Sequence, residues 1–219
     1  RAAEELVGSG HLEQGRPMLE QLVSDTGLKP SSGRGWFGAF RRKPRWKTLD
    51  FASLSDEGHA DEELFKLDVA WTASMGRRLL HAEEGAALHR AHLELALAVG
   101  EPERLLRALA GEVRVQGENG DPEWQESFQH LIKQAQARRS RVALARITAA
   151  GALSALTTGA WVRAIELAES AEQTFRHNQV GAAWERFECR STAAFAHLNR
   201  GDYRAAADKA LPLVRELEQ

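Results

Sequence analysis

Two histidines three residues apart are the best candidates in this sequence for metal ligands. His89 and His92 would share one face of a helix, and His81 precedes His89 by eight residues. Imidazole nitrogens bind zinc, nickel or iron, but here no Asp or Glu completes a ligand set at helical spacing. The alternative is a pair of partly exposed histidines between Ala and Leu residues. We favour that alternative and expect neither a metal nor another cofactor.

Other sequence motifs that support catalysis are missing. A phosphate-binding loop needs glycines followed by Lys and Ser or Thr, and Gly8-Ser9-Gly10 is too short to form one. The nucleophile motifs of kinases and hydrolases are also missing. A single cysteine, Cys189, leaves no internal disulfide framework and fits a reducing, cytoplasmic compartment, where we expect a buried and unreactive thiol. The sequence therefore predicts that this segment is not an enzyme.

Basic and aromatic residues gather between positions 29 and 47, where seven Lys and Arg side chains occur without any acidic residue. Such a cluster suits nucleic acid, a membrane surface or an acidic protein segment. The alternative is that aromatic rings fold back against the helices and leave the cations in water. The net charge of −2 argues against nucleic acid. The candidate residues are Arg34, Trp36, Phe37, Phe40, Arg41, Arg42, Lys43, Arg45, Trp46 and Lys47.

The composition predicts that helices position these residues. The 219 residues include 36 Ala and 27 Leu, against 22 residues of Ile, Val, Thr and Tyr combined. Ala and Leu favour helices, whereas β-branched and aromatic residues favour strands. The longest apolar stretch, 142–156, contains Arg146 and falls short of the roughly 20 residues that span a bilayer. We therefore expect a soluble, all-α protein.

Glycines divide the chain into helical segments. Gly10, Gly100, Gly117 to Gly120, Gly159 and Gly201 each follow an apolar-periodic segment, as C-terminal caps do. The divisions predict a first helix pair at 1–26, a basic aromatic loop or linker at 27–58, central helical pairs at 59–140 and C-terminal repeats at 141–219. The expected helices are 1–9, 12–26, 59–79, 82–99, 102–116, 122–138, 141–157, 161–177, 181–199 and 203–218.

The turn glycines also reveal an internal repeat. The segment 156–164 aligns with 198–206, and 7–15 fits the same frame. A bulky residue follows each glycine by two positions, and a small one follows by five. The bulky residue would fill the gap at the turn, while the small one would let two helices approach closely. These positions hold Leu12, Trp161 and Tyr203, and Gly15, Ala164 and Ala206.

This pattern resembles the tetratricopeptide repeat family, with Gly201-Asp202-Tyr203 followed by Ala206 as its best match. The resemblance implies antiparallel helix pairs stacked as a right-handed solenoid. The spacing from Gly159 to Gly201 is 42 residues, compared with 34 in that family. Longer helices are therefore expected here.

A narrower resemblance covers residues 60 to 219. The runs 67–76, 85–93 and 98–102 resemble the helical region that follows serine/threonine kinase and AAA-type ATPase domains in large bacterial signalling proteins. The resemblance implies a regulatory or partner-binding role for this segment, with any catalysis elsewhere in the parent chain.

First helices of such repeats line a concave groove. The offsets from the turn glycines place Arg146, Ala149, Leu153 and Leu156 there, and Arg residues of the segment 102–116 could join them. An apolar floor with Arg at its edge would suit a peptide or helix with an acidic flank. The alternative is that these residues only pack against neighbouring helices. The candidates are Arg104, Arg107, Arg114, Arg146, Leu153, Glu188, Phe195 and Asn199.

The sequence thus favours a noncatalytic repeat module that binds a protein or peptide, or couples domains of one chain, in a bacterial signalling protein. The competing hypothesis is an adaptor for membranes or nucleic acid that acts through residues 34–47.

Overall fold

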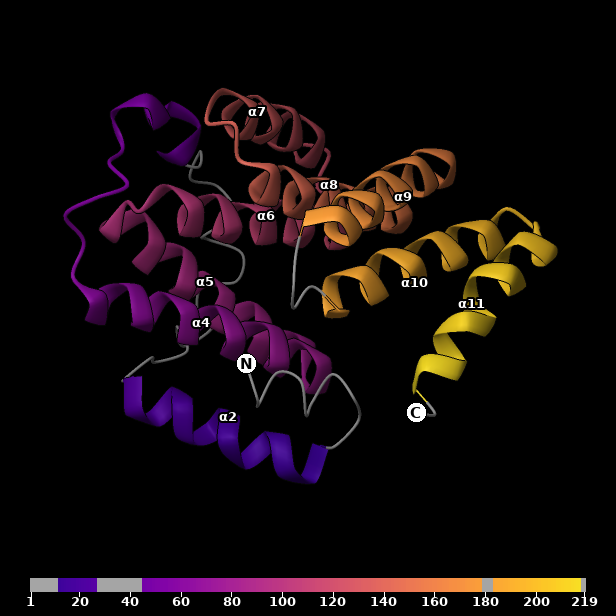
Figure 1. The fold of residues 1–219 in the computed structure, drawn as a ribbon, viewed down its shortest axis with the longest axis horizontal. Helices are drawn as coiled ribbons and strands as arrows, with labels where there is room; N and C mark the ends of the chain where they lie inside the picture. The colour runs from indigo at the N-terminus through magenta and orange to yellow at the C-terminus, as the bar shows by residue number, and fades with distance from the viewer. Residues whose placement is uncertain (1–11, 27–44, 179–182, 218–219) are drawn as a thin grey trace. The chain divides into compact units, whose positions relative to one another are not determined.

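Nine α-helices and two short 3₁₀ turns make up the part of the chain that the computed structural model describes, which is residues 12–26, 45–178 and 183–217. No strand occurs within those ranges, so the predicted all-α class is confirmed. The helices in Figure 1 are α2 (Leu12–Thr26), α4 (Asp61–Leu80), α5 (Ala82–Val99), α6 (Pro102–Glu118), α7 (Trp124–Ala137), α8 (Arg141–Thr157), α9 (Trp161–Asn178), α10 (Ala183–Asn199) and α11 (Tyr203–Leu217).

The expected helices lie within two residues of the observed ones at both ends. The expected helix at 1–9 and most of the expected loop lie outside the described residues. Within the remainder of that loop, the turns η1 (Arg45–Thr48) and η2 (Phe51–Ser53) form. Among the helices that could be assessed, none is both long and apolar enough to cross a bilayer.

Three turn glycines take the backbone conformation that the repeat requires. Gly100, Gly159 and Gly201 have φ angles of 75°, 82° and 79°, in the left-handed region that favours glycine. The predicted cap at 117–120 is correct only for Gly120, because Gly117 lies inside α6. Gly117 therefore has a different role from the turn glycines.

The chain divides into two compact units, Arg1–Ala108 and Leu109–Gln219. The division falls within α6, whereas the sequence places its last domain boundary at 140–141. In the first unit α4 packs against α5 and α2 packs against α4. Trp46 of η1 and Phe51 of η2 are both buried, as are Leu67 of α4 and Leu88 of α5. Trp46 and Phe51 are thus the largest fully buried side chains among the described residues before α6.

Helix α8 is the central element of the second unit, where it contacts α7, α9 and α10. Small or polar side chains cover several sides of this helix, and most of them are buried. A helix that is buried on more than one side needs such residues, because bulky ones would hold its neighbours apart. Its buried residues are Ala143, Ala145, Ile147, Thr148, Gly151, Ala152, Ser154 and Ala155.

Helices α6 and α8 meet at Gly117 and Ser154. The Ser154 hydroxyl donates a hydrogen bond of 2.9 Å to the Val113 carbonyl oxygen of α6. A Cβ atom on Gly117 would lie 2.5 Å from the Ser154 Cα atom, which is too close for two carbon atoms. Gly151 of α8 leaves similar room for the Phe128 ring of α7. Glycine at 117 therefore permits a backbone approach that no other residue allows.

Replacing Gly117 by Ala tests this close approach. In an unobstructed helix the change would raise stability by about 1 kcal/mol, because alanine favours helix more than glycine does. Here we expect it to lower the free energy of unfolding by about 1–3 kcal/mol, because the backbone at Ser154 must move. Urea unfolding followed by circular dichroism measures the difference, and an increase in stability would contradict the steric argument.

Candidate functional site

Asp68 of α4 organises the polar cluster of the first unit. The Arg104 side chain grips it with two hydrogen bonds, of 3.1 Å from Nε and 2.8 Å from Nη2. Arg107 donates a third bond of 2.6 Å. Burial raises the pKa of the Asp68 carboxyl, but the hydrogen bonds and charges of the two arginines outweigh burial and hold this pKa below its usual value. Asp68 is therefore ionised and attaches α6 to α4.

Glu101 positions Arg104 at the start of α6. Its carboxylate is buried and accepts hydrogen bonds from the backbone N–H groups of Arg104 at 2.8 Å and Glu103 at 3.3 Å. It therefore caps the first turn of the helix, where N–H groups lack partners within the helix. The same carboxylate also lies 3.4 Å from Arg104 Nη1.

A buried aromatic group continues the cluster. The Arg107 guanidinium lies 5.4 Å from the centroid of the Trp71 ring, within cation–π range. The His92 ring centroid lies 5.8 Å from that of Trp71 and 6.2 Å from that of His89. His92 is completely buried, and its ring nitrogens have no hydrogen-bond partner among the described residues.

The surroundings of His92 favour its neutral form. Burial lowers its pKa well below the usual value, the electrostatic interactions with His89 and Arg107 lower it further, and Asp68 opposes them. The expectation of partly exposed histidines is thus wrong, because both imidazoles are buried. This burial comes from α5, which carries both histidines, together with Trp71 of α4 and Arg107 of α6. No group of three or more potential metal ligands occurs within the described ranges.

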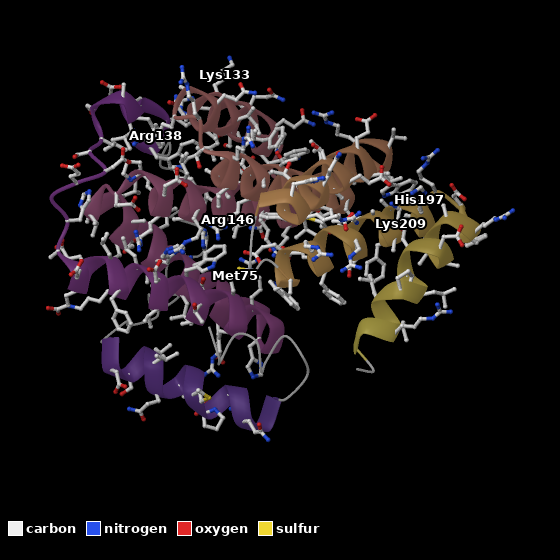
Figure 2. The ribbon with its side chains drawn as sticks, viewed as in Figure 1. Met75, Lys133, Arg138, Arg146, His197 and Lys209 are labelled. Carbon is white, nitrogen blue, oxygen red and sulfur yellow. The ribbon has the colours of Figure 1, made fainter. Side chains whose placement is uncertain are left out.

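The two remaining groove arginines lie in the second unit and bind carboxylates of α10. Arg114 of α6 pairs with Glu188, and its Nε atom lies 2.9 Å from Glu118. Burial lowers the pKa of Arg114, but the two carboxylates outweigh burial and raise it. Arg146 of α8, labelled in Figure 2, lies 3.7 Å from Glu185. Both arginine side chains are mostly buried, with 18% and 24% of their surface exposed, and both are held in ion pairs.

Helices α8 and α10 each carry a row of candidate residues along one side, and these rows together are named the α8–α10 face. In α8 the four residues of the row are only partly buried. In α10 the row becomes more exposed towards the end of the helix, where Phe195 is 57% and Leu198 47% exposed. The face comprises Arg146, Ala149, Leu153 and Leu156 of α8 and Glu188, Ser191, Phe195 and Leu198 of α10.

The predicted groove set is thus only partly brought together. Arg104 and Arg107 belong to the first unit, where Asp68 holds them. Arg114, Arg146 and Glu188 are joined by ion pairs in the second unit, in which Leu153 and Phe195 also lie. Asn199 is exposed at the last position of α10.

Most of the predicted basic aromatic patch lies outside the described residues, namely 34, 36, 37 and 40–43. At its end Trp46 is buried, with 2% of its surface exposed, and Lys47 is half-buried. Because the Trp46 ring is buried, in this conformation it does not insert into a membrane or stack on a base.

Cys189 is buried against Ala145, Ala171 and Phe175. Burial raises its thiol pKa, and the neighbouring carboxylates of Glu188, Glu172 and Glu185 raise it further, so the thiol stays protonated and unreactive. The expectation of a buried cysteine is confirmed.

Sequence analysis missed Asp68, Trp71 and Glu185. Asp68 precedes Arg104 by 36 residues, and Glu185 follows Arg146 by 39, so helical spacing gives no signal for either pair. Beside Glu185 in α10, the rings of Trp184 and Phe187 stack with their centroids 5.5 Å apart.

No protein-family model, no curated protein and no solved structure matches this chain.

Buried neutral His92 predicts a loss of stability in mild acid. Its pKa is lower in the folded chain than in the unfolded chain, where it is near 6.5, so the unfolded state binds the proton more readily. The stabilisation is complete above that pH and declines below it, by about 1 kcal/mol at pH near 5.5. Urea unfolding above pH 6.5 or so and at pH near 5.5 measures this loss of stability. We expect the loss to be smaller in His92→Leu.

His177→Gln serves as the matched control, because His177 is exposed on α9. Its ring is hydrogen-bonded to the Gln173 carbonyl oxygen of the same helix. This variant should keep the pH dependence of the unaltered protein. Equal pH dependence in His92→Leu and in the unaltered protein would contradict the assignment to His92.

Proposed function

We propose that this chain is a noncatalytic helical-repeat module that binds another protein through the α8–α10 face. The proposal includes a solenoid arrangement similar to that of tetratricopeptide repeats. It also places the module in a cytoplasmic bacterial signalling protein, where it would couple a partner or another domain of the same chain to the parent protein's activity.

The packing within the second unit supports the repeat interpretation. Helix α8 pairs with α9, and α10 pairs with α11, each across a turn glycine in the left-handed conformation. Helix α10 also contacts both helices of the preceding pair, as the first helix of a stacked repeat would. The small residues Ala164 and Ala206 are buried five positions after their glycines. This is the role that the repeat frame assigns to them.

The exposed apolar side chains at the end of the α8–α10 face carry the binding proposal. Phe195 and Leu198 lie one turn apart on α10, and each leaves about half of its surface in water. Half-buried Leu153 and Leu156 on α8 occupy the aligned positions of the preceding pair. Single exposed apolar residues are common, but rows of them on two helices that contact each other are typical of a surface that a partner covers.

Site-specific cross-linking tests the proposed face. We expect a photoreactive phenylalanine at position 195 to form a cross-link with one protein in lysate of the source cells. The same residue at position 162 should not, because Val162 is as exposed as Phe195 but lies on α9, outside the face. Mass spectrometry of the cross-linked band identifies the protein.

A further variant separates specific binding from accidental contact. Leu198→Asp alters an exposed residue, so circular dichroism should show an intact fold, while the cross-link at position 195 should be lost. Equal cross-linking at positions 162 and 195, or its persistence in Leu198→Asp, would rule out the face as the binding surface.

A further inference from the structure

Helix α11 leaves an apolar face uncovered. Among the described helices only α10 packs extensively against it, and Figure 1 shows α11 beside α10. Ala206 and Leu213 are buried on one side of α11. On another side Leu211 is 54% and Val214 51% exposed, and Ala207 is exposed with them. Ala207, Leu211 and Val214 together are named the α11 face.

A neighbouring helix covers the aligned positions of α9. In the repeat frame Val214 corresponds to Glu172, which is buried and lies 3.8 Å from Arg190 of α10. Ala207 likewise corresponds to Ile165, which is also buried. Stacked repeats that end in water require a polar outer face, whereas the α11 face is apolar. This face is therefore suited to be covered by another element.

Two residues of opposite charge border the α11 face. Asp208 and Arg215 are both exposed, and neither forms an ion pair with another described residue of this chain. They are seven residues apart, which is close to two helical turns, so both lie on the same side of α11. Their separation along the helix axis is about 10.5 Å, at 1.5 Å per residue, and Leu211 lies between them.

This order of charges is complementary to itself. If two such helices pack antiparallel about a twofold axis near Leu211, Asp208 of each copy lies opposite the partner's Arg215. The same rotation brings the two copies of Leu211 together and places Ala207 near the partner's Val214. Parallel packing in register would instead bring like charges together. A patch that matches its own copy after a twofold rotation is what a symmetric dimer requires.

We propose that this chain forms a symmetric homodimer in which the α11 faces of two copies pack antiparallel. Two ion pairs between Asp208 and Arg215 border an apolar contact centred on Leu211. One helix face from each copy buries less surface than a standard-size interface, so we expect a Kd in the micromolar range. The α11 face is separate from the α8–α10 face, so this inference goes beyond the proposed function and does not rest on it.

Sedimentation equilibrium of the full chain tests the inference. Between about 1 and 100 μM the mean mass should rise from that of one chain towards that of two. Leu211→Asp places two carboxylates at the twofold axis and should weaken association about ten-fold or more. Val162→Asp is the matched control, because Val162 is 55% exposed but lies on α9, and it should leave association unchanged. Circular dichroism should show an intact fold in both variants.

Charge reversal tests the antiparallel arrangement. In Asp208→Arg each contact joins two arginines, and in Arg215→Asp each contact joins two aspartates. Each variant alone should therefore dimerise about five-fold or more weakly than the unaltered chain at low salt. An equimolar mixture of the two variants should recover the lost affinity, because each contact then joins an arginine to an aspartate. These differences should shrink at about 0.5 M salt, as screening removes the charge contribution.

A chain that stays monomeric at about 100 μM would overturn the inference and leave the α11 face to a different molecule. A dimer that Leu211→Asp does not weaken would also overturn it, because the contact would then lie elsewhere on the chain. A mixture of the charge variants that associates no better than its components would rule out the antiparallel pairing. The cross-link at position 195 tests the proposed function separately, so the two failures can be told apart.

Discussion

The second unit depends on how closely other helices can approach α8. The hydrogen bond from Ser154 to the Val113 carbonyl forms only because Gly117 has no side chain to separate α6 from α8. On another side, Gly151 gives the Phe128 ring of α7 a place to lie. In a closely packed interior, volume added at one position displaces the neighbouring side chains. Gly117 and Gly151 therefore determine where α6 and α7 lie against α8.

This packing also determines which side of α8 can carry larger side chains. Buried positions on this helix are small or polar, with Ile147 as the exception. Arg146, Leu153 and Leu156 occur together on a less buried side, where their size does not push the neighbouring helices away. The surface that we propose for a partner is therefore a consequence of the same steric constraint that assembles the unit.

Local features of the fold could be predicted from the sequence, because helical periodicity and glycine caps are set by nearby residues. The bounds of α8 and the left-handed turn at Gly159 are examples. Tertiary neighbours could not be predicted in this way. His92 has unremarkable neighbours in sequence, yet α4 and α6 bury it with Trp71 and Arg107. The same is true of Asp68, whose importance comes from two arginines on another helix.

Arginines are conspicuous in a sequence, but their partners decide what they do. In the first unit Arg104 and Arg107 hold Asp68 and thereby join two helices. In the second unit Arg114 holds Glu188 and thereby joins α6 to α10. Since an internal carboxylate is present at high effective concentration, it outcompetes a similar group on a separate molecule.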